Sequence, residues 1–171
     1  GGSFSVHSKE NYEITQTYIS STNILKTNFR EKNSGFTIYD WMPCYSLENK
    51  KIYSPSLIYR LLEVDYGEPE ISITFSPQIN FAEGRTTLKI KGKDLELTNP
   101  CLKSESFVLK TNYDLKDLIK CNKKVLKKNY YFALGTQEDL SYSLSLKKTY
   151  TDLNRTKDYW LEWIKSLRFK T

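Results

Sequence analysis

The chain has 171 residues and a formal net charge of +6, and 39% of its residues are hydrophobic, 14% aromatic and 27% charged. This length provides one sizeable hydrophobic core without disulfide or metal staples, and no apolar run approaches the ~18 residues that a membrane-spanning helix needs. The composition excludes transmembrane and collagen-like proteins and predicts a globular domain.

Alternation of apolar and polar residues with period two dominates most of the chain, which is typical of half-buried strands in antiparallel sheets. The first such segment is 12–18. Segments 24–30 and 36–41 form a predicted hairpin around the turn-prone sequence Lys-Asn-Ser-Gly. Pro43 ends this hairpin, because proline cannot donate to a strand ladder.

Two further hairpins are predicted along the chain. The first joins 57–64 to 71–75 across the polar residues 65–68, and the second joins 86–91 to 95–98 around a Gly-Lys-Asp turn. Three hairpins in series predict an antiparallel meander rather than βαβ units.

Segments 106–110 and 130–134 are predicted as further strands. Residues 115–126 are ambiguous, since their apolar positions fit either a helical stripe or two short strands divided at Asn122. Given the surrounding β context, we expect the two strands.

The pattern changes after Thr149, where apolar residues recur mostly at spacings of three and four: Leu153, Tyr159, Trp160, Trp163, Ile164 and Leu167. This spacing predicts an amphipathic helix that begins near Asp152 or Asn154. Two tryptophans on a terminal helix imply a large apolar surface to cover, either the sheets or a domain that follows. The sequence thus predicts an all-β fold at 1–150, built from hairpins, with one C-terminal linker helix at 151–171.

The densest basic segment of the chain is almost entirely lysine: Lys116, Lys120, Lys123, Lys124, Lys127 and Lys128. It lacks the arginine forks and the aromatic rings that nucleic-acid recognition usually draws on. We interpret it as a solvated surface and expect neither a nucleic-acid nor a membrane partner.

The three cysteines, Cys44, Cys101 and Cys121, cannot all pair with one another and show no C-x-x-C spacing. A disulfide framework or a zinc site is therefore not expected. We expect buried thiols in a reducing compartment, and hence a cytoplasmic protein. Because the chain opens Gly-Gly-Ser without an initiator Met, we also expect that it derives from a longer polypeptide.

No constellation in the sequence supports catalysis. His7 is the one histidine and has no partner at the spacing of a triad or a metal site, so we expect a surface or edge residue. Neither a G-x-G-x-x-G nor a P-loop pattern occurs, so no cofactor is expected. For Asp40 we favour a carboxylate that caps the backbone N–H groups of the next loop over a substrate contact.

The aromatic residues leave one alternative open. Sugar-binding modules stack pyranose rings on exposed Trp or Tyr, and Tyr39 and Trp41 are the candidates for such a contact. Most of the 13 tyrosines and 8 phenylalanines fall at alternating strand positions, where packing in a core explains them.

Several segments between residues 22 and 60 resemble a known pattern. The segment 22–29, Gly35 and the tetrapeptide at 40–43 are similar to T-N-[VI]-L-x-T-x-F…G…D-[FW]-M-P, and 57–60 is similar to a following L-[VI]-x-R strand. This pattern belongs to the N-terminal β-sandwich domain of prokaryotic glycoside hydrolase family 15 proteins, which include glucoamylase, glucodextranase and trehalase-like members. Ten of the matching positions are taken as candidate site residues: Thr22, Asn23, Leu25, Thr27, Phe29, Asp40, Trp41, Met42, Pro43 and Arg60.

Other segments resemble the same family in the same order. Residues 1–4 are similar to its GG-x-F strand start, and Gly67 to its turn glycine. Residues 77–81 are similar to its P-R-F-D-Y segment, with Gln and Asn in place of Arg and Asp. Residues 160–163 are similar to the W-x-x-W helix that leads into its catalytic domain.

The resemblance implies a supersandwich of two antiparallel sheets. In the family it is followed by an (α/α)6 barrel, whose two glutamates hydrolyse α-glucosidic bonds with inversion. The resemblance places both glutamates after Thr171 and an opening strand before Gly1, and it implies a noncatalytic chain without metal or cofactor. The implied partners are the barrel of the same polypeptide and, as sugar, an α-glucan or trehalose. The helix residues implied at the contact between the domains are Trp160, Trp163, Ile164 and Leu167.

Overall fold

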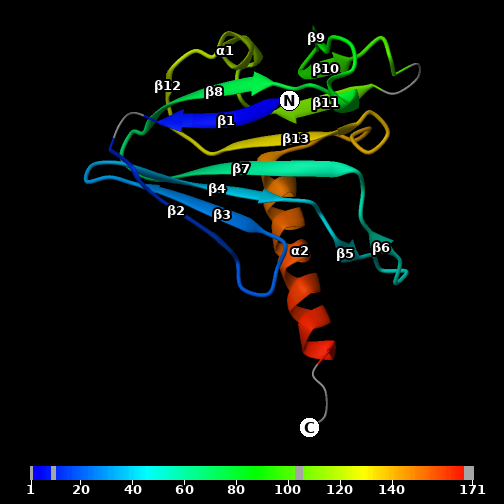
Figure 1. Cartoon of the computed structure of the whole chain (residues 1–171). Coiled ribbons are helices and arrows are strands. Elements are labelled where there is room, and N and C mark those ends of the chain that lie inside the picture. The colour runs from blue at the N-terminus through cyan, green and yellow to red at the C-terminus, as the bar shows by residue number, and fades with distance from the viewer. Residues whose placement is uncertain (1, 9–10, 103–105, 168–171) are drawn as a thin grey trace.

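The strands of the computed structural model build two facing antiparallel sheets and a small ribbon (Figure 1). The structure describes residues 2–8, 11–102 and 106–167. Gly1 and the end of the predicted linker helix lie outside the described residues. The larger sheet has the order β2-β3-β4-β7-β13-β11-β10-β9, the smaller has the order β1-β8-β12, and β5 pairs with β6. The strands are Ser3–Ser8 (β1), Glu13–Tyr18 (β2), Leu25–Arg30 (β3), Gly35–Trp41 (β4), Tyr45–Ser46 (β5), Ile52–Tyr53 (β6), Leu57–Tyr66 (β7), Glu70–Ser76 (β8), Thr87–Lys91 (β9), Asp94–Thr98 (β10), Phe107–Thr111 (β11), Lys124–Val125 (β12) and Tyr130–Thr136 (β13).

Two of the three predicted hairpins are confirmed. Strands β3 and β4 pair antiparallel with Phe29 opposite Phe36, and β9 and β10 pair with Leu97 opposite Leu88. In both, the alternation of side chains across the strand sets the register, because a slip of one residue would turn the apolar set to solvent.

The predicted hairpin between 57–64 and 71–75 is wrong. Both edges of β7 are occupied, by β4 on one side and β13 on the other, so β8 crosses to the smaller sheet and pairs with β1 and β12. The crossing passes Gly67 at φ 68°, where an added Cβ would lie 2.0 Å from the carbonyl oxygen of Asn33. A tight turn that only glycine fits therefore redirects the chain, and the sheet order departs from a simple meander.

The prediction of two short strands at 115–126 is wrong for the first half of this segment, which forms helix α1 (Leu115–Lys120). Asp114 caps it by accepting from the backbone N–H groups of Lys116 at 2.8 Å and Asp117 at 2.9 Å, and Leu118 is its buried residue. The second half contains β12, as predicted. An N-cap aspartate stabilises a helix by about 1 kcal/mol. This local cap favours a helix at 115–120 although the neighbouring segments are strands.

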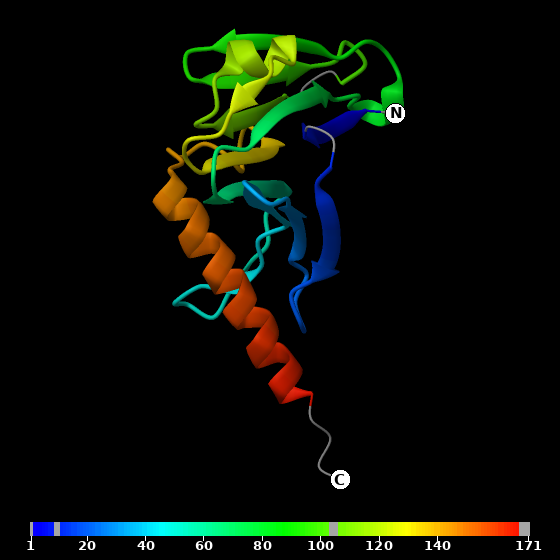
Figure 2. The same ribbon diagram turned by 90° about the vertical axis from the view of Figure 1, so that its left-hand side faces the viewer.

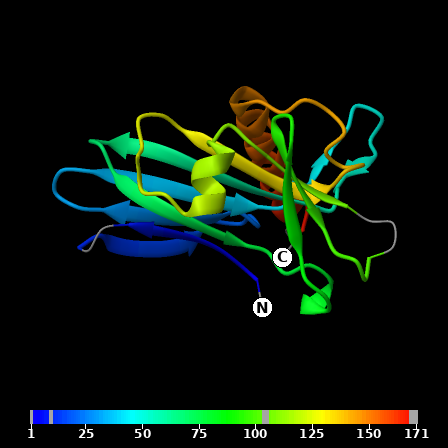
Figure 3. The same ribbon diagram turned by 90° about the horizontal axis from the view of Figure 1, so that it is seen from above.

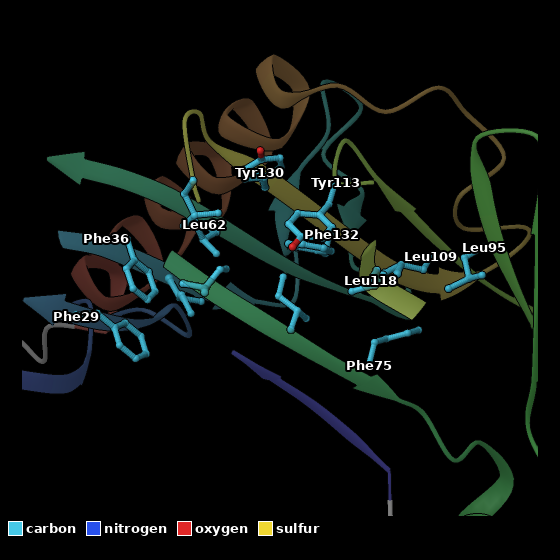
Figure 4. Close-up of a cluster of buried hydrophobic side chains, with 14 of the residues drawn as sticks. Phe29, Phe36, Leu62, Phe75, Leu95, Leu109, Tyr113, Leu118, Tyr130 and Phe132 are labelled. Atoms are coloured by element: carbon cyan, nitrogen blue, oxygen red, sulfur yellow. The ribbon is translucent and has the colours of Figure 1, made fainter. Parts of the chain in front are cut away.

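The main core lies between the two sheets (Figure 4). Inward-facing residues of β8, among them Ile73 and Phe75, meet those of β4, β7 and β13, and the Phe29 and Phe36 rings stack with centroids 4.3 Å apart. A second cluster, with Trp41, Tyr59 and Leu153, fills the opposite face of the larger sheet beneath helix α2 (Leu146–Ser166). The larger sheet is therefore covered on both faces near its centre, by a sheet on one side and a helix on the other.

Helix α2 crosses one face of the larger sheet and continues beyond it. Figure 2 shows its C-terminal half extending past the strands, and in Figure 3 the helix and the smaller sheet lie on opposite sides of the larger one. The fold thus combines an all-β body with one projecting helix, which agrees with the predicted fold class.

Candidate functional site

Helix α2 begins earlier than the predicted start near Asp152. Ser145 is its N-cap and accepts a hydrogen bond from the backbone N–H of Lys148 at 3.2 Å. Before Thr149 the apolar residues Leu140, Tyr142, Leu144 and Leu146 alternate with serines. This period-two pattern is typical of a strand and hides the helix start, which the serine cap marks.

A buried carboxylate anchors α2 to the strands. Asp152 is fully buried and accepts hydrogen bonds from Tyr45 Oη at 3.0 Å, Tyr59 Oη at 3.1 Å and Lys148 Nζ at 2.7 Å. A buried charge is tolerated only when it is paired and hydrogen-bonded. Lys148 lies on α2 itself and supplies the opposite charge, whereas Tyr45 on β5 and Tyr59 on β7 hold the helix against the strands. The sequence pattern marks Asp152 only as a possible helix start, with no sign of this buried role.

The tyrosines around Asp152 remain neutral donors. Burial raises the pKa of the Tyr45 phenol well above its ordinary value, and the negative charge of Asp152 raises it further. Burial likewise raises the pKa of Tyr59, helped by the neighbouring hydroxyl of Tyr142 and by Asp152. Both phenols can therefore donate to the carboxylate throughout the neutral pH range.

The same helix also holds the β5–β6 ribbon. The guanidinium of Arg155 lies 3.9 Å from the centroid of the Tyr45 ring and donates to the carbonyl oxygen of Ser46 at 3.1 Å. Arg155 thus links the ribbon to the helix, and the end of α2 projects beyond this contact.

The apolar stripe of α2 continues after the sheet ends. Its first half buries Thr149, Leu153 and Thr156 against the strands. Its second half presents the residues named here the α2-end surface: Trp160, Trp163, Ile164 and Leu167. Of these, Trp163 is 44% exposed, Ile164 40% and Leu167 46%.

The α2-end surface is aromatic as well as apolar. The Trp160 and Trp163 rings meet edge to face with centroids 5.6 Å apart. Trp160 Nε1 is buried and has no hydrogen-bond partner in the part of the chain that the structure describes. Exposed tryptophan is rare on free surfaces and enriched at protein contacts, so these features make the α2-end surface the candidate functional site.

The ten candidate residues that carry the resemblance lie on or next to β3, β4 and β7. Thr22 and Asn23 shape the turn before β3, where Asn23 Nδ2 donates to the carbonyl oxygen of Met42 at 3.0 Å. Thr27 and Phe29 are buried on β3, Leu25 is half-buried, and Pro43 is buried after β4. Met42 is 50% exposed. These positions thus act mainly in packing and turn geometry.

Asp40 does not cap the following loop, and that expectation is corrected. Its two carboxylate oxygens accept from Arg60 Nε at 2.7 Å and Arg60 Nη2 at 3.1 Å. Arg60 also donates to the carbonyl oxygen of Phe4 at 2.5 Å and lies 4.4 Å from the centroid of its ring. The pair therefore ties β4 and β7 of the larger sheet to β1 of the smaller one.

The two aromatic candidates for a sugar contact lie in different surroundings. Trp41 is only 3% exposed and stacks on Tyr59 with centroids 4.9 Å apart, so it offers no free ring face. Tyr39 is half-buried on the helix side of the sheet. Burial, followed by the charge and hydrogen bond of Glu63, raises the pKa of Tyr39 to about 12.

The remaining candidates lie apart from these groups. His7 is exposed on the edge strand β1, as predicted. Five of the six clustered lysines are exposed, and the sixth, Lys124, forms an ion pair with Asp117 at 2.9 Å. The expected burial of the cysteines is wrong, because Cys101 and Cys121 are exposed and Cys44 is half-buried. Within the described residues no group of three or more His, Cys, Asp or Glu could hold a metal ion.

Neither protein-family models, nor curated proteins, nor solved structures match this chain. Among the helices of residues 2–8, 11–102 and 106–167, none has the length and apolar character to cross a membrane.

Proposed function

We propose that this chain is a noncatalytic β-sandwich domain that packs, through the α2-end surface, against a helical catalytic domain of a family 15-like glycoside hydrolase. The partner domain would hydrolyse α-glucosidic bonds with its own two glutamates. The chain's part would be to support the folding of that domain and to fix its orientation.

One observation carries the proposal. The apolar stripe of α2 continues past the strands (Figure 2), and it leaves Trp163, Ile164 and Leu167 each 40% or more exposed. A solvent-facing helix end would present charged residues there, because exposed tryptophan and leucine together favour association. Because Asp152 holds α2 against β5 and β7, the α2-end surface has a defined orientation relative to the larger sheet.

The motif residues support the same proposal more weakly. They surround the strands that carry the Asp40–Arg60 pair and the turn closed by Asn23. Such positions would be retained in a scaffold, because each sets a turn, a buried side chain or a link between the sheets.

The alternative of an independent sugar-binding module has less support. Of its two candidate aromatics, Trp41 is buried and only Tyr39 remains partly accessible. Calorimetric titration with maltooligosaccharide and trehalose tests this alternative. Detectable binding that is lost in Tyr39→Ala would favour the module over the scaffold.

The proposal is tested first by the reading frame. It requires several hundred further codons after Thr171 that encode a helical domain, and a stop codon directly after Thr171 would refute it. In the longer protein, Trp163→Glu with Leu167→Glu should lower the midpoint of thermal inactivation, while the control Lys157→Glu on the exposed side of α2 should not. Equal effects of the double variant and the control would also refute the proposed contact.

A further inference from the structure

A single phenylalanine projects from the loop between β8 and β9. Phe81 is 102% exposed, whereas Tyr18, the next most exposed large apolar side chain of the described residues, is 63% exposed. The hydrophobic effect stabilises a phenyl ring only where the ring leaves water. Phe81 therefore gains nothing from packing within the part of the chain that the structure describes.

The backbone around Phe81 has an unfavourable conformation. Asn80, Phe81 and Ala82 have φ angles of 56°, 53° and 68°. These angles lie in the left-handed region, which residues with a Cβ rarely adopt, and the three residues form one left-handed turn. Such a turn persists only where its surroundings impose it, and strain of this kind concentrates at functional sites.

The neighbouring structure holds this turn at both ends. Asn99 is 3% exposed, and its Nδ2 donates to the carbonyl oxygens of Ile79 at 3.3 Å and Glu83 at 2.7 Å. Thr86 Oγ1 accepts from the backbone N–H of Ile79 at 3.1 Å. A buried side chain thus ties the two ends of the loop together, so the loop presents Phe81 to solvent in a defined direction.

An apolar pocket of about 300 Å³ lies at the base of the same loop. No charged residue lines it, and six of its eight lining residues are apolar: Met42, Leu57, Ile58, Ile79, Phe107 and Leu134. Met42 is 50% exposed and Ile58 52%, so the pocket is open to solvent. An apolar cavity of about 150 Å³ holds a benzene molecule, so this pocket has room for a phenyl ring.

We propose that two copies of this chain form a symmetric dimer in which Phe81 of each copy enters the apolar pocket of the other. One chain carries both halves of the contact, and Ile79 places them on the same loop. A two-fold axis beside the loop makes the contact twice, because in an isologous interface each patch meets its counterpart reciprocally. The loop also carries exposed Glu83 and Arg85, which present opposite charges to the approaching copy.

The area that this contact buries sets its strength. An enclosed phenylalanine buries about 150–250 Å², so two rings and the pocket surfaces that receive them bury roughly 600–1,000 Å² in total. Stable interfaces bury about 1,200–2,000 Å², and smaller ones are transient. We therefore expect a weak dimer that forms reversibly at high protein concentration.

The dimer contact is independent of the proposed contact at α2. Ile79, Phe107 and Leu134 of the pocket pack against the core between the two sheets. Helix α2 covers the opposite face of the larger sheet, where Leu153 is buried. Loss of one contact therefore leaves the other intact.

Sedimentation velocity from low micromolar to millimolar concentration tests the dimer. Phe81→Ser removes the ring, and Ile58→Glu places a charge in the pocket. Each variant should weaken self-association at least tenfold, because apolar contacts at the centre of an interface carry most of its binding energy. The matched control Tyr18→Ser removes another exposed aromatic ring and should leave self-association unchanged.

A mixture of the two variants gives the most specific result. Phe81→Ser keeps an intact pocket and Ile58→Glu keeps an intact ring, so an equimolar mixture should form heterodimers through one of the two contacts. The mixture should therefore associate more strongly than either variant alone. If Ile58→Glu fails to fold, Met42→Glu takes its place, since Met42 is also half exposed at the pocket.

Four outcomes would overturn the proposal. They are a chain that stays monomeric up to millimolar concentration, a control that weakens association as much as Phe81→Ser, a mixture no more associated than its components, and open-ended polymers in place of a dimer. Binding of the monomeric chain to phospholipid vesicles through Phe81 would assign the ring to a membrane surface and would also overturn it.

Discussion

The buried carboxylate of Asp152 is expected to be the main polar anchor of α2, and Asp152→Ala tests it. The change removes the acceptor of three donors, Tyr45, Tyr59 and Lys148. Tyr45 is buried and loses the partner of its hydroxyl, which costs about 1–3 kcal/mol. Tyr59 keeps the Tyr142 hydroxyl at 3.3 Å as a second partner, so it adds about 1 kcal/mol at most.

The third donor contributes little to the loss, because the Lys148 side chain is 38% exposed and its ammonium can return to water. The sum is a destabilisation of about 3 kcal/mol. For a chain of this size it corresponds to a fall in Tm of roughly 6–12 °C. Urea unfolding followed by tryptophan fluorescence gives the free energy of unfolding.

Asp158→Ala on the exposed side of the same helix is the matched control. It makes the same change in helix propensity, which favours alanine by roughly half a kcal/mol, without removing a buried acceptor. If the two variants unfold within 0.5 kcal/mol of each other, about the spread of ordinary surface changes, the anchor does not exist as described. If the anchor exists, adding Tyr45→Phe to the Asp152→Ala variant should recover part of the lost stability, because it removes the hydroxyl that Asp152→Ala leaves without a partner.

Three further outcomes are expected. Arg60→Lys should cost about 1–2 kcal/mol in urea unfolding, because lysine cannot make the forked contact with Asp40, and a loss no larger than that of Arg85→Lys would contradict the link between the sheets. Phe81→Gly should raise stability by about 1 kcal/mol, since the exposed residue 81 has a φ of 53°, which is strained for a bulky side chain, and a lower urea midpoint would show that the turn is not strained. Above about pH 10 the unfolded chain loses phenolic protons that the folded chain retains, so stability should fall as pH rises, and ionisation measured at 295 nm should coincide with unfolding rather than precede it. The tyrosines whose raised pKa predicts this are Tyr39, Tyr45, Tyr53, Tyr59, Tyr113, Tyr131 and Tyr150.

Local signals predicted most strands and two of the three hairpins, but not the partners of β7 and β8. The alternation in β7 and β8 marks both segments as strands, and the polar residues between them suggest a hairpin. Whether two successive strands pair depends on whether an edge is free, and β4 and β13 already occupy both edges of β7. Those partners are distant in sequence, so no local pattern reports them.

The candidate site was predicted in part, for a similar reason. The spacing of Trp160, Trp163 and Leu167 predicted an apolar helix face, and the structure places two of these residues in the open. Asp152 was missed because its partners, Tyr45 and Tyr59, lie about a hundred residues away. A carboxylate on the apolar side of a predicted helix was the available signal, since such a residue is retained only where buried donors meet it.

The two exposed apolar surfaces arise because the packed layers of this fold differ in extent. On one side α2 outruns the strands and exposes Trp163 and Leu167, and on the other β2 outruns the smaller sheet and exposes Ile14 and Tyr18. If these residues were merely tolerated on the surface, replacing each by a polar residue of similar size would leave stability unchanged and improve solubility. If partners cover them, the same changes would leave the isolated chain intact but weaken assembly at one surface without affecting the other. Independent loss at the two surfaces is therefore the outcome that distinguishes a domain with two docking sites from one with an incidentally apolar rim.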